Sequence, residues 1–161
     1  MEVKIRPLRE DDAKTSYKWR NDTEVFKYTG ANYDHEITLE DESNWIRRVS
    51  KNENEYRCAI IANEEYVGNI YLTDIENGHA TYHIFIGNKD FWGKGIAKEA
   101  SRLIINYGFN VLNLETIELE VRKQNKRAFE LYKSLGFQIR EYNNDWIKMT
   151  INHGSNENKS L

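Results

Sequence analysis

Residues 78–108 read GHATYHIFIGNKDFWGKGIAKEASRLIINYG, and this stretch decides the fold of the chain. In its first part, Thr81 and His83 alternate with Tyr82 and Ile84, which is the period of a strand with two different faces. After Gly93 and Gly95, apolar residues recur at helical spacing, namely Ile96, Ala100, Leu103, Ile104 and Tyr107. A helix start leaves backbone N–H groups unpaired, and glycines let an anion approach them closely. The stretch therefore predicts a strand, a phosphate-binding turn and a helix.

Composition narrows the class of protein. The chain has 161 residues, which suits one domain with a core of its own. Its net charge of −3 and its pI near 5.9 disfavour nucleic acid as a partner and suit a cationic substrate. Cys58 is the single cysteine and lies in an apolar run, so we expect a buried thiol. We find no signal-peptide layout and no apolar run of ~20 residues, so we expect a cytoplasmic protein that does not interact with membranes.

The rest of the chain supplies a sheet and further helices. Alternating apolar patterns predict strands at 3–8, 56–62, 66–72, 79–86, 116–121, 137–141 and 146–151. Helical patterns follow at 11–20, 39–51, 96–112 and 126–135, with Thr38 and Asn125 as caps and Gly136 after the last of them. We expect a single α/β domain over 1–151 and a disordered polar tail over 152–161.

Two segments resemble signature motifs of the Gcn5-related N-acetyltransferase (GNAT) superfamily. FWGKGIAKEA (91–100) resembles its acetyl-CoA pyrophosphate loop, and VRKQNKRAFELYKSLGF (121–137) resembles its second signature. The resemblance covers residues 2–151 and implies a mixed, mostly antiparallel sheet of six to seven strands in the order β-α-α-β-β-β-α-β-α-β-β. The segments WRND (19–22) and WIRR (45–48) resemble the branch of ribosomal-protein N-terminal, polyamine and amino-sugar acetyltransferases.

The resemblance also implies roles for individual residues. The backbone of Ile84, Phe85 and Ile86 would pair with the pantetheine arm of acetyl-CoA, as an added strand does. Backbone amides of the loop would bind the pyrophosphate, from Trp92, Gly93, Lys94, Gly95, Ile96 and Ala97. Asn125 would meet the cofactor near its thioester, and Tyr132 would protonate the departing thiolate. Asn125 and Tyr132 are two helical turns apart, so both can lie on one helix face.

Two positions differ from the common pattern of the superfamily. Asp90 stands where many relatives have glutamine or arginine, which changes the local charge of the phosphate loop. Thr81 stands where relatives often have a glutamate that acts as a base. An alkylammonium has a pKa near ~10.4, so a proton acceptor is still needed. His83 is the first candidate, and His79 or a water relay are the alternatives; simple packing of these histidines is the competing interpretation.

The acceptor pocket is the least defined part of the prediction. In this superfamily the region of the first two helices walls that pocket, which implies that Trp19, Arg20, Tyr28 and Tyr33 bind the substrate together with Thr81. Packing of these side chains against the sheet is the competing interpretation.

The resemblance implies transfer of acetyl from acetyl-CoA to a primary amine in a ternary complex. The expected acceptors are an amino sugar, an aminoglycoside or a polyamine, and then a protein N-terminus. Alternatives are a non-catalytic acyl-CoA-binding module and an interaction domain without a cofactor. We expect no metal site, and family analogy suggests a homodimer.

Overall fold

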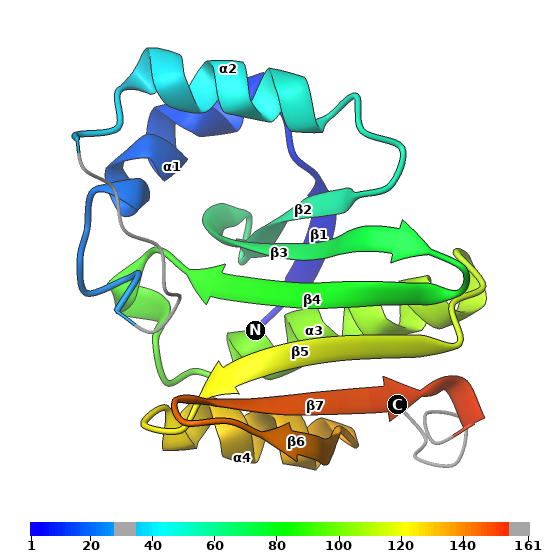
Figure 1. Cartoon of the computed structure of the whole chain (residues 1–161). Coiled ribbons are helices and arrows are strands. Elements are labelled where there is room, and N and C mark those ends of the chain that lie inside the picture. The colour runs from blue at the N-terminus through cyan, green and yellow to red at the C-terminus, as the bar shows by residue number, and fades with distance from the viewer. Residues whose placement is uncertain (28–34, 155–161) are drawn as a thin grey trace.

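The computed structural model describes residues 1–27 and 35–154. Its centre is a seven-stranded sheet in the order β1-β2-β3-β4-β5-β7-β6 (Figure 1). The strands are β1 (Val3–Pro7), β2 (Tyr56–Ala62), β3 (Glu65–Glu76), β4 (His79–Ile86), β5 (Thr116–Arg122), β6 (Gln138–Tyr142) and β7 (Trp146–Asn152). All neighbours pair antiparallel except β4 and β5, which are parallel. The mixed, mostly antiparallel α/β fold expected from the sequence is confirmed.

Helices and short turns connect the strands. They are η1 (Glu10–Asp12), α1 (Ala13–Arg20), α2 (Leu39–Val49), η2 (Lys89–Phe91), α3 (Ile96–Asn110) and α4 (Lys126–Leu135). Both predicted caps form, since Thr38 accepts a hydrogen bond from the Asp41 amide and Asn125 accepts one from the Ala128 amide. Gly136 ends α4 with a φ of 107°, which a residue with a side chain rarely adopts.

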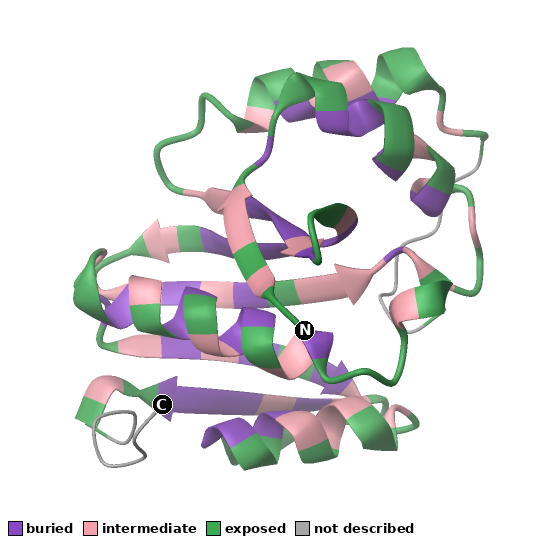
Figure 2. Cartoon of the chain, turned by 180° about the vertical axis from the view of Figure 1, so that it is seen from behind, coloured by how far each residue is buried: buried purple, intermediate pink, exposed green. Residues whose placement is uncertain are grey.

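The two faces of the sheet differ sharply. Ala80 and Tyr82 of β4 point into the main core, which α3 and α4 complete and which contains Ile104, Phe109 and Leu135. The alternate residues of β4, Thr81 and His83, point to the opposite face of the sheet. On that face a second, smaller apolar cluster joins the sheet to α1 and α2. Figure 1 shows no helix in front of β5 and β7, and Figure 2, seen from behind, shows α3 and α4 on the opposite face, so part of this face is left uncovered among the described residues.

Several boundaries differ from the sequence expectation. The helix expected at 11–20 is a 3₁₀ turn followed by α1, because Asp12 turns back to accept hydrogen bonds from Arg6 and from the Arg9 amide. Strand β3 extends to Glu76, since the following turn at Asn77 and Gly78 has positive φ angles and reverses the chain directly into β4. At the C-terminus, β7 includes Asn152, and His153 stacks on the ring of Phe109, so the expected disordered tail does not begin at 152; its part from 155 onward lies outside the described residues.

Candidate active site

A fork between β4 and β5 lies at the middle of the sheet. The parallel ladder joins only three residue pairs, from His79 with Thr116 to Thr81 with Glu118. Within the described residues, no residue of β5 pairs with β4 beyond Thr81. The inner edge of Ile84, Phe85 and Ile86 is therefore available to an extended ligand. One acceptor on this stretch is used, because the indole Nε1 of Trp92 donates to the carbonyl of Ile86 at 2.8 Å.

The loop at the wide end of the fork has the geometry of an anion site. Gly93 and Gly95 have φ angles of 76° and 79°, a conformation that only glycine adopts without strain. Gly95 is directly followed by α3, so the amides of the first turn point out of the helix end. A β-carbon at Gly95 would meet no atom within 4 Å, which leaves space for a phosphate to approach.

Two basic side chains lie near this loop, Arg127 and Lys94, and they contact different residues. Arg127 of α4 would lie 3.1 Å, through its Nη2, from a β-carbon built at Gly93. Arg127 therefore lies beside the phosphate loop. The sequence does not predict this placement, because it depends on how α4 packs against the rest of the protein. Lys94 lies over the ring of Phe91, with Nζ 5.5 Å from the ring centroid.

Lys89 links the same loop to the segment after α1. Its Nζ lies 2.8 Å from a carboxylate oxygen of Asp22 and 2.8 Å from one of Glu24. The hydrogen bond from Lys89 lowers the pKa of Asp22, and the two carboxylates raise the pKa of Lys89. The charge of Lys89 is thus already compensated, so it contributes to the shape of the loop more than to phosphate binding.

Tyr132 lies on α4, with its ring packed edge-on against Tyr82 at a centroid distance of 5.6 Å. The residue is only 8% exposed, and burial raises the pKa of its hydroxyl to about 12, while hydrogen bonding with Tyr82 acts in the opposite direction. A neutral phenol at physiological pH can donate a proton to a thiolate. Asn125 lies at the start of the same helix, and its side-chain oxygen is used by the cap.

A short polar chain runs behind Tyr132 through the apolar core. The Tyr82 hydroxyl lies 2.6 Å from Oγ of Ser101, and Ser101 donates to the carbonyl of Ala97 at 2.6 Å. Because the single proton of Ser101 is used on that carbonyl, the Tyr82 hydroxyl donates to Ser101. This chain connects strand β4 to the first turn of α3.

His83 lies on the sheet face opposite the main core, two residues beyond the last β4–β5 pair. Part of its surface is exposed, while its ring packs beside the buried Tyr71 at a centroid distance of 6.5 Å, and its Nε2 lies 3.0 Å from Oγ1 of Thr73. Its pKa is lowered by desolvation first and then by the positive charge of Arg57, against the opposing effects of Asp74 and Glu55. A lowered pKa keeps the imidazole neutral near pH 7, which is the form that accepts a proton.

Glu118 and His79 form a pair next to Thr81, at the closed end of the fork. Nε2 of His79 lies 2.6 Å from Oε1 of Glu118, and Nζ of Lys148 lies 3.5 Å from its other oxygen. The carboxylate that is absent at Thr81 is thus present one strand away, on the same face. No local signal in the sequence marks Glu118, because the pairing of β4 with β5 brings together residues 37 positions apart.

The residues expected to wall the acceptor pocket are only partly described. Trp19 is 8% exposed and packs on Tyr66 at a centroid distance of 4.8 Å. Arg20 lies over the ring of Trp45 and forms an ion pair with the buried Glu42, at 3.2 Å. Both side chains thus pack against neighbouring side chains of the sheet and of α2, as the packing interpretation of the sequence expects. Tyr28 and Tyr33 lie outside the described residues.

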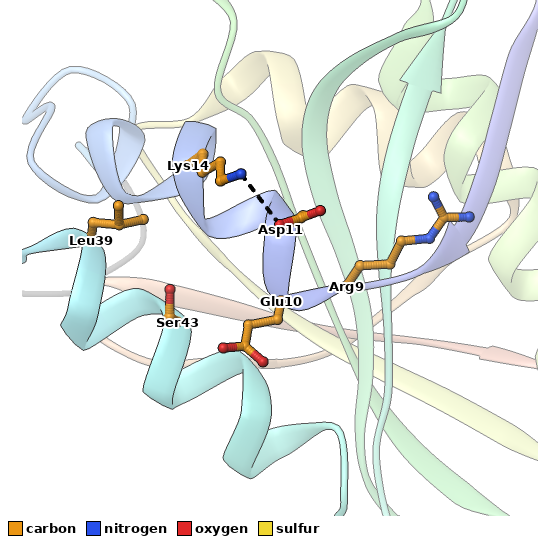
Figure 3. Close-up of a pocket in the computed structure, with 6 residues that line it drawn as sticks. All are labelled: Arg9, Glu10, Asp11, Lys14, Leu39 and Ser43. Carbon is orange, nitrogen blue, oxygen red and sulfur yellow. Dashed lines mark ion pairs between the residues drawn. The ribbon is translucent and has the colours of Figure 1, made fainter.

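A separate pocket of about 450 Å³ lies between η1, α1 and α2 (Figure 3). It is lined by Arg9, Glu10, Asp11, Lys14, Leu39 and Ser43. None of these residues belongs to the fork or to the phosphate loop, and the ion pair between Asp11 and Lys14 is largely exposed. We therefore assign the candidate active site to the fork.

Residues 1–27 and 35–154 contain no group of three or more His, Cys, Asp or Glu side chains that could hold a metal ion. In the same ranges, every helix is too short or too polar to cross a bilayer.

Comparisons with known proteins agree with this geometry. A family model described as "Acetyltransferase (GNAT) domain" matches residues 2–138. The spermidine N(1)-acetyltransferase of Escherichia coli K12 is 31% identical over 140 residues, which cover 85% of this chain and 73% of that protein. An uncharacterized N-acetyltransferase, p20 of Bacillus licheniformis, is 33% identical over 147 residues, covering 86% and 82%.

Solved structures share the fold. The spermidine N-acetyltransferase from Vibrio cholerae, crystallised with CoA and spermine, superposes with a TM-score of 0.87 over 96% of this chain and 98% of that one. The two sequences are 22% identical, so this likeness supports the fold.

Proposed function

Since the chain belongs to the GNAT acetyltransferase domain family and is an acetyl-CoA-dependent N-acetyltransferase, we propose that its acceptor is a primary amine of a polyamine. The observation that carries this choice is the 31% identity with a spermidine N(1)-acetyltransferase over most of the chain. The negative net charge supports a cationic acceptor. We therefore propose a polyamine as the acceptor in preference to an amino sugar or an aminoglycoside.

The fork and its loop fit acetyl-CoA, which supplies an activated acetyl group when bound. We propose that the backbone of Ile84–Ile86 binds the pantetheine arm and that the amides of residues 92–97 bind the pyrophosphate. The left-handed glycines and the open space beside Gly95 support this assignment. Arg127 adds a positive charge at the same place, beside Gly93.

Two side chains handle the protons of the reaction in this proposal. An ammonium with a pKa near ~10.4 must lose a proton before its nitrogen attacks the thioester carbonyl, and neutral His83 accepts it. As the carbon–sulfur bond breaks, Tyr132 donates its hydroxyl proton to the thiolate. The nitrogen loses two protons overall, so one restores Tyr132 and the other leaves to solvent. Thr81, on the same sheet face as His83, contacts the acceptor.

The test is thiol release from acetyl-CoA with spermidine, spermine, an amino sugar, an aminoglycoside and a short peptide as acceptors. We expect the highest kcat/KM with the polyamines. Faster turnover of an amino sugar, or of the peptide, would contradict the polyamine assignment. Binding of acetyl-CoA without turnover of any amine would instead favour the non-catalytic module.

We also propose a homodimer through β6, the last strand of the sheet. All five of its residues are exposed, and Ile139 and Tyr142 are large apolar side chains among them. An exposed edge of this kind can pair with a second copy. Light scattering after size exclusion would give twice the mass of 19.1 kDa, whereas the single mass would overturn the assembly.

A further inference from the structure

We infer that Glu118 binds a second ammonium group of the acceptor, so that the enzyme prefers diamines and longer polyamines to monoamines. The inference deepens the proposed function and rests on it for the identity of the reaction. It assigns the selectivity to one carboxylate on β5, outside both signature motifs.

The position of Glu118 supports this role. It pairs with Thr81 at the last rung of the β4–β5 ladder, and directly paired residues lie on the same face of a sheet. That face is the one with His83, and no described helix covers it at β5. The side chain is 19% exposed, so a ligand that enters the fork from this side can reach it.

The contacts of Glu118 show that the site accepts cationic groups. Oε1 lies 2.6 Å from Nε2 of His79, which fixes the carboxylate. Oε2 lies 3.5 Å from Nζ of Lys148, beyond the usual length of a charge-assisted hydrogen bond. Lys148 is therefore close to Oε2 but does not donate a hydrogen bond to it. An ammonium group of the ligand can donate a hydrogen bond to Oε2 instead.

Lys148 also indicates the chemical class of the ligand. Its side chain ends in a primary ammonium on four methylenes, which is the same group that ends 1,4-diaminobutane. The side chain is 38% exposed and comes from β7, on the far side of Glu118 from β4. It can move into solvent when another ammonium takes its place, so Lys148 acts as a competitor for the site.

The spacing between Glu118 and His83 fits a diamine. His83 is two residues beyond Thr81, so strand geometry places its Cα about 8 Å from that of Glu118, from ~4.8 Å across the sheet and ~3.3 Å per residue along it. Both side chains extend from the same face and can approach each other. Two nitrogens separated by three or four methylenes can then bind with the reacting amine at His83 and its neighbour at Glu118.

The experiment compares butylamine, 1,4-diaminobutane and spermidine in the wild type and in Glu118→Gln. Glutamine keeps an oxygen for His79 and removes only the charge. We expect the wild type to prefer the diamine over butylamine in kcat/KM by roughly 10- to 100-fold, and the variant to lose most of this preference. Glu130→Gln is the charge-matched control, because Glu130 is exposed on α4, which packs on the opposite face of the sheet; it should keep the preference.

Lys148→Met gives a result of opposite sign. Removal of the competing ammonium should lower KM for the diamine several-fold and leave KM for butylamine unchanged. A second measurement, calorimetric binding of spermidine in the presence of CoA, should show weaker binding in Glu118→Gln and unchanged binding of CoA itself.

Retention of the diamine preference and of spermidine binding in Glu118→Gln would overturn the inference. Failure of the proposed function would look different, since no polyamine would then be acetylated by the wild type. In that case loss of spermidine binding in Glu118→Gln would still support the ammonium site.

Discussion

Thr81 of β4 and Glu118 of β5 form the last residue pair before the two strands separate. The closed end of the fork therefore has a hydroxyl from one strand and a carboxylate from the next. Many members of the superfamily that the sequence resembles have a glutamate at the position of Thr81. In this chain, the negative charge at the closed end comes from β5, held by His79.

Tyr132→Phe tests the proposed acid. Phenylalanine keeps the ring that packs on Tyr82 and Phe137, so the fold and acetyl-CoA binding should be preserved. Loss of the hydroxyl should lower kcat by ~10²- to 10⁴-fold, the usual effect of a positioned acid. Single-turnover kinetics with calorimetry for acetyl-CoA would measure both. Tyr107→Phe, in the stacked pair with Tyr56, is a control that should keep full turnover; an unchanged kcat in Tyr132→Phe would exclude the role.

Arg57→Met tests the proton acceptor through its pKa. The positive charge of Arg57 is the second cause, after desolvation, that lowers the pKa of His83. Without it the pKa of His83 rises, so more of the imidazole is protonated in weakly acidic solution and cannot accept a proton. The acidic limb of kcat/KM for the amine should move to higher pH, with little change above pH ~8. Arg47→Met, which removes an exposed ion pair with Glu10, should leave the pH profile unchanged. If the wild type, Arg57→Met and Arg47→Met have the same pH profile, His83 is not the proton acceptor.

Gly87→Ala and Gly95→Ala should affect different properties. A β-carbon at Gly87 would lie 2.0 Å from Cδ2 of Trp19, so the indole must move, and we expect a loss of roughly 1–3 kcal/mol in the free energy of unfolding. At Gly95 only the φ of 79° opposes alanine, at about 1 kcal/mol, but the methyl group enters the phosphate loop and should weaken acetyl-CoA binding. Urea denaturation and calorimetry would separate these effects. Equal acetyl-CoA affinity in Gly95→Ala and wild type would speak against the loop.

Asp12→Ala should destabilise the fold far more than Asp11→Ala. Asp12 is 7% exposed and accepts two hydrogen bonds from the Arg6 guanidinium, at 2.9 and 2.8 Å, and one from the Arg9 amide. Its removal leaves a half-buried cation without this carboxylate, which should cost roughly 3 kcal/mol in the free energy of unfolding. Asp11 forms only an exposed ion pair with Lys14, so its loss should cost less than about 0.5 kcal/mol. Similar denaturation midpoints would refute this difference.

The sequence predicted those parts of the fold that depend on local signals. The alternation in 79–86 and the caps at Thr38 and Asn125 act within a few residues of themselves, and each appears in the structure as expected. The left-handed backbone at Gly93 and Gly95 is predictable for the same reason, because glycine is the residue that most readily adopts a positive φ angle.

Long-range contacts were not predictable in this way. Glu118 meets Thr81 only through the register of two strands, and Arg127 approaches Gly93 only through the packing of α4. Arg20 shows the reverse problem, because a charged residue beside aromatic ones suggests a binding wall, whereas the structure pairs it with the buried Glu42. Sequence alone does not distinguish these uses of an arginine.

The hydrogen-bonded chain from Tyr82 through Ser101 to Ala97 fixes the separation between the two ends of the fork. It joins the strand beside Tyr132 to the helix turn that follows the glycine loop, so both belong to one rigid unit. The length of the pantetheine arm that suits this unit is therefore set by the fold itself. We expect analogues of CoA whose arm is shortened or lengthened by one methylene to engage either the loop or the acid, but not both at once.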